Sequence, residues 1–513
     1  MKFLLLLLFS PALIGQQRPN IIYIMTDDHD ADAISAYNKR LIQTPNLDRI
    51  AKEGALFKRS FVANSICGPV RATLLTGEHS HINGHKDNRK RFDSSRITVP
   101  KLFQKNGYQT AIVGKWHLFS YPAGFDFWKI LPGQGLYFDP RFIHMNGDTT
   151  TYKGYASDVI TTEALNWLDN RDRSKPFMLH IHHKSPHRYF LPPLKYAREF
   201  VKKIFPEPST LYVDTTGKGT AWKLQTMSIL KDMRLSSDLK VEPALISDLP
   251  EYSADSAETA YYRSIFNRIP EEERKGLQAL YAERARILRE KRPQGKELLK
   301  YKYQWYLQDY LACVASVDEN VGRVLDYLDN NDLSSNTLLI YTSDQGMYLG
   351  ENGWFDKRFM YDVSMQNPLL MRWPGRIKAG SVISEMVQNI DYAPTFLGVA
   401  GINAPSSMQG INLVPLVTGA QPDLKRDHLY YHFYEYKADH TVLPHLGVRG
   451  TRFKLIYFYT VDEWELYDLF RDPREQKNLY GKQQHKKTFE KMKKELMKLR
   501  DDYDDHEKAG ELE

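Results

Sequence analysis

The sequence has little that could link the chain covalently. Only two cysteines, Cys67 and Cys313, occur among 513 residues, so at most one disulfide can form and a disulfide-rich scaffold is excluded. No internal repeat or low-complexity tract is evident, so the chain is not a repeat array. Cys313 lies in a helical pattern from Trp305 to Leu328, where it is expected to be a small buried apolar residue. The length is ample for a large hydrophobic core.

Beyond residue 17, no apolar run is long enough to span a bilayer, so we expect no stable membrane insertion. Residues 1–17 are typical of a secretory signal peptide, with Lys2 followed by a run of leucines between Phe3 and Phe9. No cysteine stands at the end of this segment, so a lipid anchor is not expected. We therefore expect export of a soluble protein, either to the periplasm or out of the cell.

Acidic residues are outnumbered by basic ones, and the formal net charge is +7. This mild excess favours an anionic substrate or partner. Nucleic acid is not expected as the partner, because the charge is spread out and no recognition motif is present. The basic stretch 86–91 is either a solvated loop or the rim of a cleft for a polyanion.

Two continuous apolar runs, Asn20–Met25 and Asn336–Thr342, have the length of buried strands. Helical patterns alternate with such runs, beginning for example at Pro45 and Pro100 and covering Asp158–Asp169. Alternation of this kind predicts an α/β fold with a doubly wound, mostly parallel central sheet, which we place within residues 18–420.

The pattern changes after residue 420. Short aromatic β runs and an amphipathic helix at Lys486–Tyr503 predict a smaller C-terminal subdomain, residues 421–513, with an antiparallel sheet and a packed helix. Residues 194–300 are charged and irregular, with a long helical stretch from Pro270 to Glu290. This insertion either walls a substrate cleft or, as we favour here, is a solvated elaboration of the body.

Carboxylates follow both apolar strands. Asp27 and Asp28 come after the first strand, and Asp344 with the amide of Gln345 comes after the second. Because ligands bind beyond the carboxyl ends of parallel strands, we expect one shared, oxygen-rich site. Such ligands suit a hard cation such as Ca²⁺. The alternative for each acidic pair is an Asx turn at the end of a strand.

Two further strands lead to basic side chains. The run 108–113 precedes Lys115 and His117, and the run 177–182 precedes His183 and His187. A lysine binds an anion as a point charge, and a histidine exchanges a proton near neutral pH. A lone histidine is usually structural, and for His183 a structural role and a role in binding the substrate both stay open. Because both strands are expected to end at the same edge of the sheet, a functional role is favoured for Lys115, His117 and His187.

The segment Ser65–Gly77 places Cys67 at the start of a short helical pattern, with Pro69 in its first turn and Gly77 at its end. The N-terminus of a helix attracts anions, and Arg71 adds a fork of donors that matches an oxyanion. Taken alone, this pattern also fits a buried cysteine beside a solvated arginine.

The string Cys67-x-Pro69-x-Arg71 followed by Ala72–Gly77 resembles the signature of the sulfatase family, within the alkaline-phosphatase superfamily. The resemblance runs from about Arg18 to about Tyr480. It implies that a maturation enzyme, either a formylglycine-generating enzyme or a radical maturase, oxidises Cys67 to formylglycine, whose hydrated aldehyde is the nucleophile. Val70 stands where the family usually has serine.

The resemblance also implies roles for other residues. A calcium ion would be bound by the side chains of Asp27, Asp28, Asp344, Gln345 and residue 67. Gln345 stands where asparagine is usual. Arg71, Lys115 and Lys357 would hold the sulfate group. Asp344 would help to deprotonate the attacking hydroxyl, His187 would protonate the leaving sugar oxygen, and His117 would remove the last proton to expel sulfate and restore the aldehyde.

Several stretches, among them 77–85, 131–135 and 355–361, look like those of bacterial N-acetylglucosamine-6-sulfatases. This resemblance implies an exo-acting enzyme on heparan-type or mucin glycans, with a sulfated sugar as its partner. Asp356 and Arg358 would grip sugar hydroxyls or, alternatively, form a surface ion pair. His445 is the candidate for a sugar-recognising histidine in the C-terminal part.

Two other functions stay open. One is a phosphate mono- or diester hydrolase, or a sulfatase for another sulfate position, in the same superfamily. The other is a non-enzymatic protein that binds sulfated glycans and keeps Cys67 unconverted.

Overall fold

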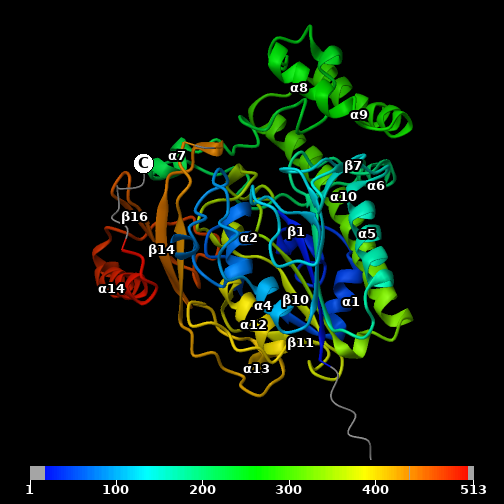
Figure 1. Ribbon diagram of the computed structural model, residues 1–513. Coiled ribbons are helices and arrows are strands. Elements are labelled where there is room, and N and C mark those ends of the chain that lie inside the picture. The colour runs from blue at the N-terminus through cyan, green and yellow to red at the C-terminus, as the bar shows by residue number, and fades with distance from the viewer. Residues whose placement is uncertain (1–17, 438, 507–513) are drawn as a thin grey trace, which may run out of the picture.

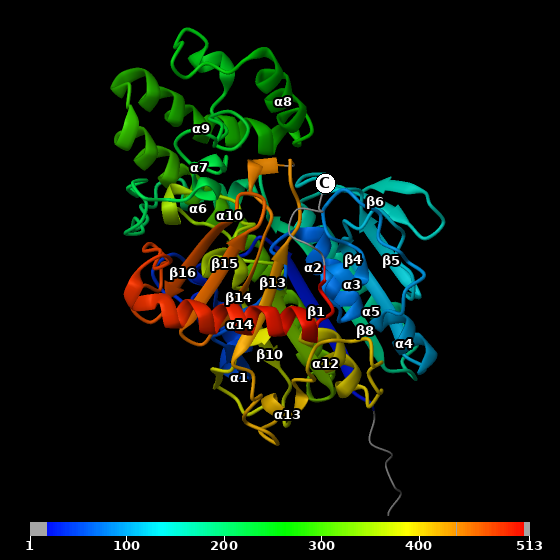
Figure 2. The ribbon, with the colours of Figure 1, turned by 90° about the vertical axis from the view of Figure 1, so that its left-hand side faces the viewer.

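The computed structural model describes residues 18–437 and 439–506, so the predicted signal peptide lies outside the described residues. Within those two ranges, no helix is both long enough and apolar enough to cross a membrane. Figures 1 and 2 show an α/β body, a helical insertion above it and a small sheet with one helix at its side.

The body is built on one ten-stranded sheet with the order β11-β2-β10-β9-β1-β8-β4-β5-β6-β7. The central strands from β9 to β5 pair in parallel, which confirms the predicted doubly wound α/β class. β10, β6 and β7 are antiparallel to their neighbours. The strands are β1 (Asn20–Asp27), β2 (Ala55–Phe57), β4 (Gln109–Lys115), β5 (Phe127–Leu131), β6 (Arg141–His144), β7 (Thr149–Thr151), β8 (Phe177–Pro186), β9 (Thr337–Ser343), β10 (Leu369–Arg372) and β11 (Ser381–Ile383).

Helices cover both faces of this sheet (Figure 1). Ile21, Tyr23 and Met25 of β1 pack in one core with α4 (Val99–Lys105) and α12 (Tyr392–Val399). Ile22 and Ile24 face the opposite core, formed with α1 (Pro45–Glu53), α5 (Ala156–Asn170) and α10 (Gly295–Asn330). Burial on both sides explains why the strand is apolar at consecutive positions instead of alternating.

The predicted helices agree with the structure within a few residues, except α10. This helix begins at Gly295, ten positions before the expected start at Trp305. Its first turns bury Leu299 and Tyr303 against the insertion and turn charged side chains outward. The apolar positions are too sparse there to reveal a helix from sequence.

The shorter helices of the body are α2 (Cys67–Thr76), α3 (Ser80–Asn83), α11 (Asp362–Met365) and α13 (Val414–Val417), and β3 (Ser60–Phe61) pairs with β12 (Val387–Gln388).

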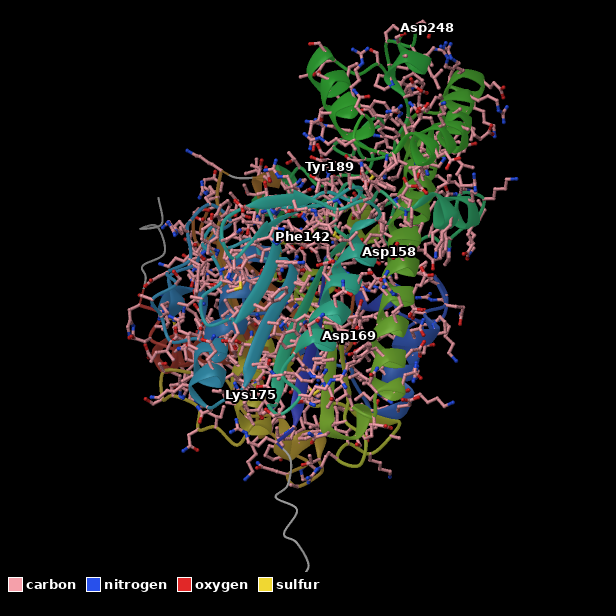
Figure 3. The ribbon with its side chains drawn as sticks, turned by 45° about the vertical axis from the view of Figure 1, so that its right-hand side comes forward. Phe142, Asp158, Asp169, Lys175, Tyr189 and Asp248 are labelled. Atoms are coloured by element: carbon pink, nitrogen blue, oxygen red, sulfur yellow. The ribbon has the colours of Figure 1, made fainter. Side chains whose placement is uncertain are left out.

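The insertion is not the solvated elaboration that the sequence analysis favours. It contains α6 (Leu194–Phe200), α7 (Thr220–Leu224), α8 (Ser256–Phe266) and α9 (Glu271–Lys291), and its aromatic side chains Tyr262 and Phe266 share a core with Tyr137 and Phe138 of the body. Figure 3 shows Tyr189 near the junction with the body and Asp248 at the far end. Apolar burial against the body therefore fixes α8 above the sheet edge.

The C-terminal region contains a separate antiparallel sheet in the order β13-β14-β15-β16, as predicted. Its strands are β13 (His428–Phe433), β14 (His445–Gly450), β15 (Phe453–Phe458) and β16 (Glu463–Asp468). Helix α14 (Lys486–Asp502) covers one face of this sheet with Met492, Leu496 and Leu499 (Figure 2). The boundary near residue 420 stays a prediction.

Candidate active site

The carboxyl ends of four adjacent parallel strands meet at one edge of the sheet. Asp27 ends β1, Lys115 ends β4, His187 follows β8 and Asp344 follows β9. Since β9, β1, β8 and β4 are neighbours in that order, residues more than 300 positions apart in sequence lie side by side. Gly114, next to the end of β4, must be glycine, because its φ is 114° and an added Cβ would lie 2.0 Å from the carbonyl oxygen of His182 in β8.

Asp27, Asp28 and Asp344 form a compact, fully buried group whose nearest oxygens all lie within 4.8 Å of one another. Burial and the neighbouring charge of Asp27 raise the pKa of Asp344 to about 8. The three carboxylates therefore need compensating positive charge before all can ionise.

Three buried cations face these carboxylates. Lys115 pairs with Asp27, Lys357 lies 2.6 Å from Asp28, and Arg71 donates to Asp344 at 3.0 Å. Burial alone would lower the pKa of the Lys357 ammonium group, but the charge of Asp28 holds it well above its usual range. The structure thus gathers the acidic and basic residues that the sequence analysis selects.

The chemistry of the group also fits a hard cation. Gln345 donates its side-chain N–H to Asp28 and lies 3.5 Å from Sγ of Cys67, but its buried Oε1 has no hydrogen-bond partner among the described residues. An orphaned amide oxygen beside three carboxylates matches the oxygen ligands that Ca²⁺ prefers.

Cys67 begins helix α2 and lies directly above this group. Its Sγ atom is 3.4 Å from Oδ1 of Asp27, and burial raises the pKa of its thiol well above the usual value. The next residue, Gly68, donates its backbone N–H to Asn88 at 2.8 Å, which fixes the start of the helix. As a thiol, Cys67 would be a poor nucleophile here.

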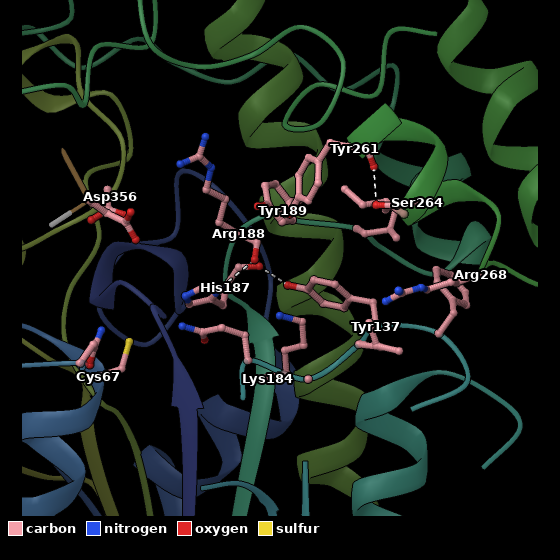
Figure 4. A pocket seen from close by; sticks show the side chains of 18 of the residues that line it. Cys67, Tyr137, Lys184, His187, Arg188, Tyr189, Tyr261, Ser264, Arg268 and Asp356 are labelled. Carbon is pink, nitrogen blue, oxygen red and sulfur yellow. Dashed lines mark hydrogen bonds between the residues drawn. The ribbon is translucent and has the colours of Figure 1, made fainter. Parts of the chain in front are cut away.

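A cavity of about 350 Å³ opens above Cys67 (Figure 4). Cys67, Lys357 and His187 lie at the end next to the carboxylates. The opposite wall comes from α8 and the residues after it. The remaining lining includes Asn88, Gln134, Tyr137, Lys184, Arg188, Tyr189, Tyr261, Arg268, Asp356, Arg358 and His440.

Asp356, Arg358 and His440 form a connected polar group at one side of the cavity. Nε2 of His440 lies 3.3 Å from Oδ2 of Asp356, and Nε of Arg358 donates to Oδ1 of the same carboxylate at 3.1 Å. Glu435 accepts from Arg358 at 2.7 Å. Asp356 and Arg358 are both buried, so they are not the surface ion pair that was the alternative.

The two histidines proposed for sugar binding do not line the cavity. His183 is fully buried on the face of β8 that α5 and α10 cover, because residues 181, 183 and 185 alternate to that side. His445 is also fully buried, and its Nε2 accepts the backbone N–H of Met360 while Tyr431 and Phe433 stack on its ring. Neither position fits contact with a sugar in this cavity.

His117 lies beside the acidic group but on the far side of Gln134, with the two side-chain nitrogens 3.3 Å apart. It lines a neighbouring hollow with Phe119 and Tyr121. Burial and the charge of Lys115 hold the pKa of its imidazole well below the usual value. In this structure Gln134 separates His117 from the cavity above Cys67.

Sequence reasoning missed several lining residues. Asn88 lies within the basic stretch 86–91, and His440 lies in a loop without a recognisable motif. Tyr261 and Arg268 belong to the insertion, whose residues carry no pattern that indicates a cavity. Lys184 had a signal, because it stands in the strand end that also carries His187, and so had Asn88, because the stretch 86–91 was a candidate for the rim of a cleft.

A parallel sheet with buried carboxylates, paired lysines and a helix-starting cysteine at its carboxyl edge defines a class of ester hydrolase. The chain belongs to the sulfatase family, whose model matches residues 19–402. It is therefore a sulfuric ester hydrolase. The model for the C-terminal region of N-sulphoglucosamine sulphohydrolase matches residues 350–502.

Among its relatives is an N-acetylglucosamine-6-O-sulfatase of Bacteroides thetaiotaomicron, which is 46% identical over 496 residues, or 96% of this chain and 87% of the relative. A solved structure in complex with its substrate, D-glucosamine-2-N,6-O-disulfate, superposes with a TM-score of 0.92 at 44% identity and covers 96% of this chain and 100% of that one. The phosphonate monoester hydrolase of Agrobacterium radiobacter shares the fold, with a TM-score of 0.68 at 21% identity over 95% of this chain and 96% of its own.

Proposed function

We propose that this sulfatase removes the 6-O-sulfate from N-acetylglucosamine at the end of heparan-type or mucin glycans. The observation that carries the proposal is the cavity itself, in which Cys67 and Lys357 adjoin the buried carboxylates and Asp356, Arg358 and His440 form a polar side wall. The relative that is 46% identical is an N-acetylglucosamine-6-O-sulfatase, and the superposing structure holds a 6-O-sulfated glucosamine. Both likenesses support this choice of sugar and position.

The proposal includes the oxidation of Cys67 to formylglycine by a maturation enzyme. A buried thiol whose pKa is raised is largely protonated at neutral pH and attacks weakly. The hydrated aldehyde would supply a hydroxyl nucleophile at the same position, beside Asp27 and Gln345.

We also propose Ca²⁺ as the cofactor. Asp27, Asp28, Asp344, Gln345 and residue 67 would hold the ion, which would supply positive charge against the sulfate oxygens and lower the pKa of bound oxygen groups. With the carboxylates neutralised in this way, Lys115, Lys357 and Arg71 would be free to face a sulfate group.

His187 is the group that we propose to protonate the leaving sugar oxygen. Its Nδ1 lies 2.7 Å from the carbonyl oxygen of Arg188, so Nδ1 donates there and Nε2 is left to carry the exchangeable proton. Nε2 lies 3.7 Å from Asp28, and His187 lines the cavity. Burial holds the pKa of His187 well below its usual value, and a sulfate bound nearby would raise it again.

Sugar recognition falls to Asp356, Arg358 and His440 in this proposal. A carboxylate, a guanidinium and an imidazole together offer acceptors and donors to adjacent hydroxyls. Their mutual contacts keep their rotamers fixed, so little side-chain entropy is lost on binding. His440 takes the place that the sequence analysis assigned to His445.

Release of sulfate from a panel of sulfated monosaccharides tests the proposal. We expect N-acetylglucosamine 6-sulfate to be turned over fastest among sugars that carry one sulfate. Faster release from a 2-, 3- or 4-sulfated sugar would reject the assigned position. A phosphate ester hydrolase would instead turn over an aryl phosphate much faster than an aryl sulfate.

Export remains part of the proposal, with residues 1–17 as the supporting observation. Sequencing the N-terminus of protein purified from outside the cytoplasm of its native host tests it. A mature N-terminus near Arg18 is expected, and an intact leader in the cytoplasm would contradict export.

A further inference from the structure

Lys184 is an unusual side chain in the cavity above Cys67. It comes from the end of β8, and its residue is only 5% exposed. Its Nζ lies over the ring of Tyr137, 4.7 Å from the centroid, and no carboxylate among the described residues lies within ion-pair distance. Figure 4 shows this side chain between His187 and Tyr137.

The cations of the sulfate site are different, because each has a carboxylate partner. Lys115, Lys357 and Arg71 contact Asp27, Asp28 and Asp344. A buried ammonium group without such a partner is destabilised by the loss of water. Accordingly, burial lowers the pKa of Lys184 to about 8. A ligand that brought its own negative charge would relieve this cost.

Arg268 reaches the same cavity from the opposite wall. It follows α8 of the insertion and lines the cavity, and within the part of the chain that the structure describes its side chain has no acidic partner. Figure 4 shows Arg268 directed toward Tyr137 and Lys184. By contrast Arg188, which also lines the cavity, is already paired with Asp238 at 2.7 Å.

Resting on the proposed function, we propose that Lys184 and Arg268 form a second anion-binding subsite, so that the preferred substrate carries another anionic group besides the sulfate that is cleaved. The group is a tetrahedral sulfate or a planar carboxylate, both of which accept charge-assisted hydrogen bonds from an ammonium or a guanidinium. It sits either on the same sugar as a second sulfate or on the neighbouring sugar as a uronic carboxylate. The cavity extends from Cys67 to α8, so an anionic group from either source would lie within the same cavity.

The test compares three substrates of the enzyme carrying formylglycine. N-acetylglucosamine 6-sulfate has one anionic group, glucosamine-2-N,6-O-disulfate has a second sulfate, and a disaccharide of 6-sulfated N-acetylglucosamine with a uronic acid has a carboxylate. Lys184→Met keeps the length of the side chain and removes its charge. We expect it to raise KM by about tenfold to a hundredfold for one of the two dianionic substrates, the effect of losing one hydrogen bond to a charged group. The change for the singly sulfated sugar should be much smaller.

The substrate that responds identifies the source of the second anion. Lys184→Arg should recover most of the affinity, because it restores the charge, whereas a purely structural role would not be rescued by a bulkier side chain. Arg268→Gln should weaken the same substrate in the same direction. Arg263→Gln, on the preceding helix α8 but outside the cavity lining, is the matched control.

Equal KM changes on all three substrates would overturn the inference and make Lys184 a residue that only positions His187. Absence of any change in Lys184→Met would overturn it as well. Failure of the proposed function has a different result. If the enzyme turns over an aryl sulfate but releases no sulfate from any of the sugars, the proposal that its substrate is a 6-sulfated sugar is rejected. Calorimetric binding to Cys67→Ala then tests the inference independently of turnover. The dianionic sugar must bind more tightly than the singly sulfated one. Adding Lys184→Met to Cys67→Ala must remove that difference in affinity.

Discussion

Nζ of Lys357 lies 2.6 Å from Oδ2 of Asp28, although 329 positions separate the two residues in the sequence. The same relationship links Lys115 to Asp27 and Arg71 to Asp344. Each of these three buried carboxylates therefore has a cation beside it.

Removal of calcium by a chelator should abolish sulfate release and leave the fold intact. The loss of rate should reach about a hundredfold or more, because the ion supplies charge that no side chain replaces. Sulfate release and circular dichroism measure the two effects, and added Ca²⁺ should restore activity. Asp27→Ala or Asp344→Ala should cause the same loss without recovery. Normal calcium content and rate in either variant would show that these residues do not bind the metal.

Cys67→Ala should abolish turnover while keeping the fold and substrate binding. Cys67 packs at the start of a buried helix, and alanine fits there without new polar groups. Thermal unfolding and calorimetric binding of the sulfated sugar check the expectation. Intact-mass analysis of the peptide around position 67 is the companion measurement. An unmodified thiol in inactive protein from the native host would favour a glycan-binding protein over an enzyme.

His440→Ala should raise KM for the sulfated sugar by about tenfold or more and change turnover of an aryl sulfate much less. The imidazole contacts Asp356 at the cavity wall. It would contact the sugar part of a substrate, which an aryl sulfate lacks. Steady-state kinetics with both substrates measure the difference. The fully buried His445 serves as the comparison, because His445→Gln should lower thermal stability without this substrate selectivity. Equal effects of His440→Ala on both substrates would remove it from sugar recognition.

His183→Leu should stabilise the protein, and more so in acid. Burial lowers the pKa of His183 to about 3, and neither ring nitrogen has a hydrogen-bond partner among the described residues. Because the folded pKa lies below the unfolded value, native stability is complete above about pH 6.5 and is lost as pH falls toward 3. Between pH 7.5 and pH 5 one such histidine lowers the free energy of unfolding by about 2 kcal/mol.

Urea unfolding at pH 7.5 and pH 5 measures the effect of His183→Leu. At pH 7.5 the free energy of unfolding of the variant should equal or exceed that of the original protein, and at pH 5 the difference in favour of the variant should be larger. His506→Gln, which changes an exposed histidine, should show no such gain. A loss of stability at both pH values would mean that His183 makes a polar contact after all.

The sequence by itself was enough to predict the four central strands that carry the site, β1, β4, β8 and β9, although β8 runs to Pro186, beyond its predicted end at residue 182. Apolar runs such as Asn20–Met25 are local signals, and the residues after them fall at the carboxyl edge of any parallel sheet. For this reason the sequence predicts Asp27, Lys115, Asp344 and His187 as neighbours, and the structure brings them together.

Only the tertiary structure decided which side chains face the cavity. Period-two alternation does not say which face of β8 looks toward α10, so His183 could not be assigned from its position alone. His440 and His445 are five residues apart, yet the first lines the cavity and the second begins β14 and packs on Tyr431. Tyr261 and Arg268 join the cavity because α8 packs on Tyr137 and Phe138, a contact between distant segments. Such contacts depend on long-range packing, which no local pattern of residues encodes.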